Sequence, residues 1–79
     1  MKVGTLVQVW HDTGACGVVP VYGVVTRDLP CTFEVMWERG RLTLIRKARP
    51  NGVEPVKAFN TDTAREVLAS RGVTIPRTT

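Results

Sequence analysis

The chain has 79 residues, of which 43 % are apolar and 23 % charged, with a formal net charge of +4. This length suits one domain near the lower limit of what a single core stabilises, and the composition excludes disorder over the whole chain. The N-terminus lacks an apolar run of signal-peptide length, and no stretch approaches the roughly 18 apolar residues of a membrane span. We therefore expect one soluble, cytoplasmic domain, whose basic charge is compatible with polyanionic partners.

The first 28 residues of the chain contain two stretches with strand patterning. Residues 2–10 alternate between two partly apolar faces, and residues 18–28 are rich in β-branched side chains. Residues 11–17, HDTGACG, separate them as a loop. Inside the second stretch, Pro20 indicates an edge or a bend because it cannot donate a ladder hydrogen bond, and Gly23 predicts a β-bulge.

The middle of the chain predicts a β-hairpin. Residues 31–38, CTFEVMWE, alternate so that Phe33 and Trp37 point toward the core. Residues 39–40 form a two-residue connection, whose glycine permits the positive φ of a tight turn. Residues 41–47 then return as the next strand.

Residues 48–60 are punctuated by two prolines and an Asn-Gly pair, which indicate turns. They predict either a short edge strand around residues 56–59 or an irregular arm. This segment leads directly into the only stretch of the chain with helical patterning.

The predicted helix spans residues 61–72. Thr63 and Glu66 have the spacing of a capping box, and Gly72 stands where a C-terminal glycine cap is expected. Residues 73–79 follow as an extended tail.

Together these elements predict a mainly β fold, a small barrel of about five strands over residues 1–60 with one short C-terminal helix packed on it. The successive stretches VGTLVQV, YGVVTR, FEVMWERGR and LIRK, within residues 2–47, resemble the SH3-like barrels, a group that includes KOW, Tudor-like and Sm-like modules. The chain is also similar to small bacteriophage proteins of unknown function. This resemblance implies a binding module of phage-like origin, and a virion-associated location as an alternative to the cytoplasm.

Catalytic patterns are weak in this sequence. His11 has no serine or cysteine nucleophile at a known spacing, and Glu34 and Glu38 are roughly 13 Å apart along one strand, too far to act as a carboxylate pair. No glycine-rich phosphate loop is present. We therefore expect no enzymatic activity, no cofactor and no small-molecule substrate.

The two cysteines, Cys16 and Cys31, leave two interpretations open: a disulfide across neighbouring strands, or two buried thiols. A zinc site would have to recruit His11 and Asp12 as well. Their spacing matches no standard metal pattern, so we expect no metal.

A cluster of cations follows the predicted hairpin turn. Such a rim can contact the phosphates of RNA or DNA, but it can equally solvate a sheet edge and discourage aggregation, with Glu34 and Glu38 as cross-strand partners. Nucleic-acid binding is the first hypothesis. Its candidate residues are Arg39, Arg41, Arg46, Lys47 and Arg49.

Aromatic side chains are the second feature that bears on binding. Trp10 and Tyr22 precede a loop and a glycine, and are candidates for stacking on nucleic-acid bases. Packing in the core is the alternative for both. A second hypothesis for the function is a self-assembling or protein-binding structural component, such as a homo-oligomer in a phage particle, built through exposed strand edges.

Overall fold

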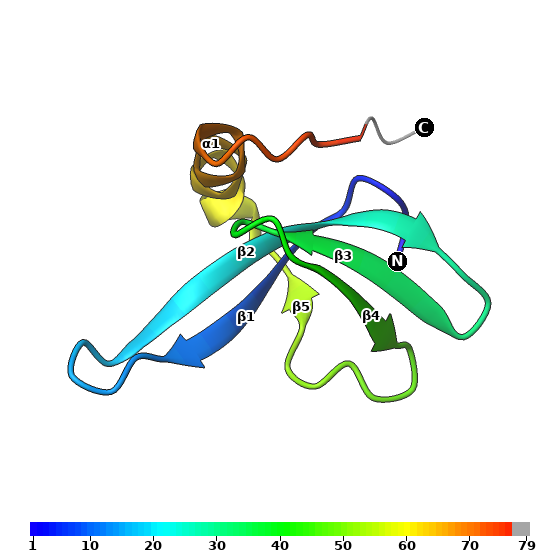
Figure 1. Ribbon diagram of the computed structural model, residues 1–79, viewed down its shortest axis with the longest axis horizontal. Helices are drawn as coiled ribbons and strands as arrows, with labels where there is room; N and C mark the ends of the chain where they lie inside the picture. The colour runs from blue at the N-terminus through cyan, green and yellow to red at the C-terminus, as the bar shows by residue number, and fades with distance from the viewer. Residues whose placement is uncertain (77–79) are drawn as a thin grey trace.

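The computed structural model describes residues 1–76 as a β-sheet with one α-helix (Figure 1). The prediction of a mainly β chain with one late helix is therefore confirmed. The elements are β1 (Leu6–Asp12), β2 (Val18–Asp28), β3 (Thr32–Trp37), β4 (Leu42–Arg46), β5 (Glu54–Pro55), the 3₁₀ turn η1 (Ala58–Asn60) and the helix α1 (Thr61–Ser70).

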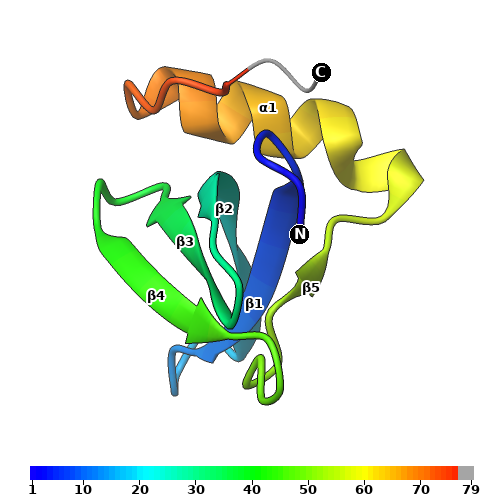
Figure 2. The same ribbon diagram turned by 90° about the vertical axis from the view of Figure 1, so that its right-hand side faces the viewer.

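The strands form one antiparallel sheet in the order β4-β3-β2-β1-β5, so β4 and β5 are its two edges. The sheet is strongly bent, with β4 and β5 on either side of its inner face and α1 across one end (Figure 2). Across this inner face, Ile45 and Val53 belong to the same core cluster. In the part of the chain that is described, β4 and β5 do not pair with each other. The structure confirms the sheet and the helix, but not the closed barrel.

Two apolar clusters lie on opposite faces of the sheet because side chains alternate along each strand. In β3, Phe33, Val35 and Trp37 are buried while the residues between them are half-buried, as the alternation predicts. The outer cluster packs beneath α1 and consists of Leu6, Tyr22, Val24, Ala64 and Leu68. The inner cluster consists of Val7, Val25, Phe33, Val35, Trp37, Ile45 and Val53.

The β-bulge predicted at Gly23 is wrong, because Gly23 pairs regularly with both neighbouring strands. The register instead shifts between Val25 and Arg27. Glycine is needed at position 23 for a steric reason. A Cβ there would lie 2.6 Å from Cγ1 of Val35 and 2.7 Å from Cε3 of Trp37. The missing side chain lets these two residues pack directly on the backbone of β2.

Pro20 confirms the prediction of an edge position. It pairs with Trp10 of β1, but β3 pairs with β2 only from Gly23 onward. The first residues of β2 and the last residues of β1 therefore form a two-stranded ribbon that extends beyond the other strands (Figure 1). A proline is tolerated there because one side of β2 has no neighbour.

The connection between β3 and β4 is three residues long rather than the predicted two. The amide of Gly40 donates to the carbonyl of Trp37 at 2.8 Å, and the amide of Trp37 donates to the carbonyl of Arg41 at 2.9 Å. Gly40 has φ 79°, as a three-residue hairpin loop with a left-handed final residue requires. The predicted need for glycine is correct, and the loop length is not.

The last strand lies earlier than the predicted residues 56–59, in Glu54–Pro55. It pairs with β1, and the Nε2 group of Gln8 donates to Oε1 of Glu54 at 2.9 Å. The amide of Val56 donates to the carbonyl of Leu6 at 2.9 Å just beyond the strand, so the nitrogen of Pro55 lies in a non-hydrogen-bonded pair and faces away from β1. The segment predicted as a strand contains η1 instead.

The helix α1 begins at residue 61 as predicted and ends at Ser70, before the predicted residue 72, while the capping of its start differs from the prediction. Its N-cap is Asn60 and no side chain caps it, so the predicted capping box of Thr63 and Glu66 does not form. At the other end, Gly72 has φ 76° and donates its amide to Ala69, while Val73 donates to Leu68. These two bonds make a Schellman motif, which confirms the glycine cap.

From Arg71 to residue 76 the chain has no regular secondary structure, and Val73 and Ile75 pack against the outer cluster. Residues 77–79 of the predicted tail lie outside the described part. No helix within residues 1–76 is long and apolar enough to cross a membrane.

Both cysteines are free and exposed, so neither the disulfide nor the pair of buried thiols is present. Cys16 lies in the β1–β2 loop and Cys31 in the β2–β3 loop, at opposite ends of β2. Within the described residues, no three His, Cys, Asp or Glu side chains come together in a group that could hold a metal ion.

Candidate functional site

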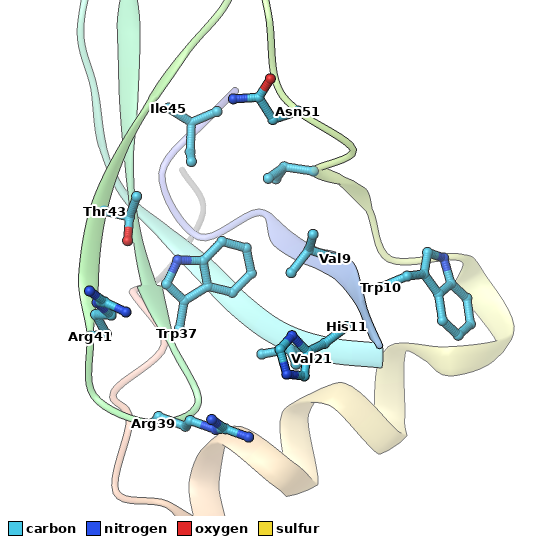
Figure 3. Close-up of a pocket in the computed structure, with 11 residues that line it drawn as sticks. Val9, Trp10, His11, Val21, Trp37, Arg39, Arg41, Thr43, Ile45 and Asn51 are labelled. Atoms are coloured by element: carbon cyan, nitrogen blue, oxygen red, sulfur yellow. The ribbon is translucent and has the colours of Figure 1, made fainter. Parts of the chain in front are cut away.

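A cavity of about 390 Å³ lies on the inner face of the bent sheet and is open to solvent (its lining residues are drawn in Figure 3). We call it the inner groove. Strands β1 to β4 and the segment before β5 contribute to its lining, which consists of Val9, Trp10, His11, Val21, Trp37, Arg39, Arg41, Thr43, Ile45, Asn51 and Val53.

The floor of the inner groove is apolar. Val9 and Val21 are cross-strand partners in the part of the β1–β2 ribbon that extends beyond β3. At this position β3 does not pair with β2. Trp37 lies opposite them, held against the backbone of Gly23 (Figure 3). Only 9 % of the Trp37 side chain is exposed, so the sheet fixes the orientation of the indole.

The rim of the inner groove is cationic. Arg39 lies in the β3–β4 turn, and Arg41 follows where the chain pairs again with Trp37. Since directly opposed residues of an antiparallel pair point to the same face, Arg41 lies on the inner side together with Trp37 and Thr43. Both arginines are exposed, and none of the lining residues within the described part of the chain carries a carboxylate. The lining therefore combines an apolar floor with two guanidinium groups.

The five cations of the predicted cluster do not form one surface. Only Arg39 and Arg41 line the inner groove. Arg46 is opposite Thr32, on the outer face that bears Leu42 and Leu44. The structure brings two of the candidates together and places the others elsewhere, Lys47 and Arg49 lying in the turn after β4.

Lys47 is engaged within the protein. Its Nζ lies 2.7 Å from Oδ1 of Asp28, which also lies 3.5 Å from the N-terminal ammonium group of Met1. The hydrogen bond from Lys47 holds the pKa of Asp28 below its usual range, and the attraction of both positive charges adds to this shift. Lys47 therefore links the end of β4 to the end of β2.

The two predicted acidic partners of the cationic cluster are also engaged elsewhere. Thr26 donates its hydroxyl to Oε1 of Glu34 at 2.8 Å, and the amide of Tyr22 donates to Oε2 of Glu38 at 3.2 Å. The described residues 1–76 contain two ion pairs, and Asp28 is the acidic partner in each of them. Arg39 and Arg41 consequently have their charges available to a ligand.

The two candidate stacking residues differ in exposure. Tyr22 is only 7 % exposed because it packs beneath α1 on the outer face, so its selection as a stacking surface is wrong. Trp10 is 53 % exposed, at the rim of the inner groove. Because Trp10 follows Val9 in β1, its ring lies on the other side of the strand, apart from Trp37 (Figure 3).

Sequence reasoning missed Trp37 as a groove residue and assigned it to the core alone. A usable signal was present in WERGR, because residues directly opposite each other beside a hairpin turn share a face. A three-residue turn around Gly40 makes Trp37 and Arg41 such a pair, with Arg39 in the turn between them. The signal shows which residues share a face, but not that the face is left open.

No family model, curated protein or solved structure matches this chain. The function must therefore be argued from the chemistry of the site. An apolar floor with one indole suits a flat, weakly polar group, and forked guanidinium groups suit an anionic group attached to it.

Proposed function

We propose that the chain is a non-enzymatic module that binds single-stranded nucleic acid, RNA or DNA, in the inner groove. The observation that carries this proposal is the position of Arg39 and Arg41 beside Trp37, in a groove whose lining, among the described residues, contains no carboxylate. Proteins that bind single strands combine a cationic track for the phosphates with an apolar or aromatic surface for the bases.

The dimensions of the groove support this proposal. Its volume of about 390 Å³ is within the range of roughly 300 to 1,000 Å³ of sites that hold small organic groups. A base can lie over Val9 and Val21, beside the largely buried Trp37. The flanking phosphates then meet Arg39 and Arg41, which can form paired hydrogen bonds with phosphate oxygens.

The fold agrees with a role as a binding module. We retain the closed small barrel of SH3-like type as a proposal, supported by the bend that brings Ile45 and Val53 into one cluster. A phage-like origin is likewise a proposal, which rests on the sequence resemblance alone. The cytoplasm, or a phage particle, is the proposed location.

The test is fluorescence anisotropy with labelled single-stranded RNA and DNA at several salt concentrations. The double variant Arg39→Ala/Arg41→Ala should bind at least tenfold more weakly. Its salt dependence should also be shallower, by about 1.4 in the slope of log affinity against log salt, because about 0.7 is lost for each phosphate contact on a single strand.

The matched control is Arg46→Ala/Arg65→Ala, which removes the same charge from the outer face of β4 and from an exposed position of α1. If binding takes place in the inner groove, this variant should keep affinity within about twofold. Equal losses in both variants would show that only net charge matters. No binding by the unmodified protein at low salt would overturn the proposal.

A further inference from the structure

The two edges of the sheet differ in their capacity to pair with another strand. β5 has two residues, and one of them is Pro55, which has no amide hydrogen to donate. β4 has five residues with no proline, and it is the last strand on its side of the sheet. Of these two edge strands, β4 is therefore the one that can be extended by another strand.

The register shows which peptide groups of β4 are free. The hydrogen bonds at its two ends join Trp37 to Arg41 and Cys31 to Lys47. In an antiparallel ladder, hydrogen-bonded pairs recur at every second residue, so Thr43 and Ile45 also direct their peptide groups toward β3. The amide and carbonyl groups of Leu42, Leu44 and Arg46 consequently point outward.

The side chains on this edge are unusual for exposed positions. Leu42 is 54 % exposed and Leu44 is 58 % exposed. Both lie on the outer face, opposite Met36 and Glu34 of β3, whereas α1 packs mainly on β1 and β2. Two exposed leucines beside free peptide groups are the combination that natural sheet edges avoid unless they pair.

We infer that two copies of this chain pair through β4, antiparallel, about a two-fold axis normal to the sheet. The register places Leu42 opposite Leu44 of the second copy, with Thr43 opposite its own equivalent on the axis. Each Leu42–Leu44 pair exchanges two hydrogen bonds, so the four outward peptide groups of each copy's leucines are satisfied. The same operation brings all four leucines together on the outer face.

This register is favoured over its neighbour by one contact. A pairing centred on Leu44 would place Leu42 opposite Arg46 of the second copy. The carbonyl of Arg46 already accepts the amide of Arg49 at 3.1 Å, so the turn after β4 occupies that position. Such a pairing would also separate two of the leucines. The register centred on Thr43 avoids both costs and places no arginine opposite an arginine.

The arrangement extends the apolar row of each outer face. Leu6 pairs with Val24, Val24 with Met36 and Met36 with Leu42, so one row crosses the whole sheet. Pairing continues this row into Leu44 of the second copy. A further consequence, which rests on the proposed function, is that both inner grooves open on the same side of the joined sheet.

Cross-linking without nucleic acid tests this inference. The background is Cys16→Ser/Cys31→Ser, because both thiols are free and exposed. Adding Thr43→Cys places two thiols on the axis in a non-hydrogen-bonded pair, whose Cα atoms lie about 4.5 Å apart and can form a disulfide. On mild oxidation, more than half of this variant should become a covalent dimer. Leu42→Cys is the control, and should cross-link at least fivefold less.

Sedimentation equilibrium supplies the second measurement. The unmodified chain should approach twice 8.7 kDa as its concentration rises. Leu44→Pro removes an outward amide hydrogen without breaking the ladder to β3, and should weaken association at least tenfold. Leu44→Thr keeps that amide hydrogen and should weaken the association of two copies less than Leu44→Pro does.

Each possible result of these experiments decides the inference. A monomer at all concentrations, or equal cross-linking of Thr43→Cys and Leu42→Cys, would overturn it. A dimer that Leu44→Pro leaves intact would also overturn it, because another surface would then be responsible. None of these results depends on binding in the inner groove, so each proposal can fail alone.

Discussion

The backbone of Gly23 forms the support for Trp37, and this contact leads to the first prediction. Gly23→Ala would place a Cβ 2.6 Å from Cγ1 of Val35 and 2.7 Å from Cε3 of Trp37, closer than carbon atoms pack. Since the main-chain oxygen of Met36 is 3.1 Å away, the new methyl group cannot move aside. We expect a loss of about 1–3 kcal/mol in the free energy of unfolding, measured by urea denaturation.

The double variant Gly23→Ala/Val35→Ala is the control for this interpretation. Removing the γ-carbons of Val35 relieves one of the two close contacts, so the two substitutions should cost less together than the sum of their separate effects. Strict additivity would show that Gly23 matters through its backbone freedom rather than through the space it leaves. The steric explanation for the loss of stability in Gly23→Ala would then be wrong.

At the scale of single residues, alternation carried most of the correct information. It placed Phe33 and Trp37 on the core side, and it associates Arg41 with the same side. It could not reveal that Lys47 is bound to Asp28, because that contact depends on which strands become neighbours. For a similar reason it could not decide between stacking and core packing for Tyr22, which packs beneath α1.

The end of α1 gives the second prediction, at the scale of a secondary-structure element. Gly72 has φ 76°, and a Cβ at this position would meet no atom within 4 Å. The cost of Gly72→Ala therefore comes from the left-handed backbone alone, and should be about 1 kcal/mol of unfolding free energy, seen as a lower melting temperature.

Gly72→Asn distinguishes this cause from a loss of packing. Asparagine adopts the left-handed conformation more readily than alanine, so it should recover part of the lost stability although its side chain is larger. If Asn is as destabilising as Ala, or more so, the backbone explanation fails. Hydrogen exchange at Val73, whose amide closes the Schellman motif, should quicken in the alanine variant.

Elements were predicted well where a local signal determined them. β-branched residues and alternation located β2 and β3, and Gly72 located the end of α1. The short strand β5 was misplaced because two residues carry no periodicity, and their pairing depends on the free edge of β1. The capping box failed because α1 continues directly from η1, which supplies the preceding turn.

At the scale of the whole molecule, neighbours along the chain become separated by the sheet. The cations from Arg39 to Arg49 are close in sequence, yet Arg41 faces the inner groove and Arg46 the outer face. Composition and spacing predicted a basic cluster, but the groove exists only because β1 and β2 extend beyond β3 and the sheet bends. These properties arise from long-range pairing, which no short motif encodes.

The ion pairs of Asp28 join three distant parts of the molecule: the N-terminus, the end of β2 and the turn after β4. Because the pKa of Asp28 is lower in the folded state than in the unfolded state, the unfolded chain takes up the proton more readily. The stabilisation is therefore present at neutral pH. It is lost as the pH falls below the ordinary aspartate pKa of 3.8, until the folded carboxylate also becomes protonated.

Asp28→Asn should accordingly lower the melting temperature at pH 7 and low ionic strength, and the difference from the unmodified chain should disappear near pH 2. Lys47→Ala removes the same interaction from its other side, since Lys47 makes the largest contribution to the shift. Once either partner is absent, the second substitution should cost little more. A difference that persists unchanged to pH 2 would mean that Asp28 acts through packing, and that charge does not hold these three segments together.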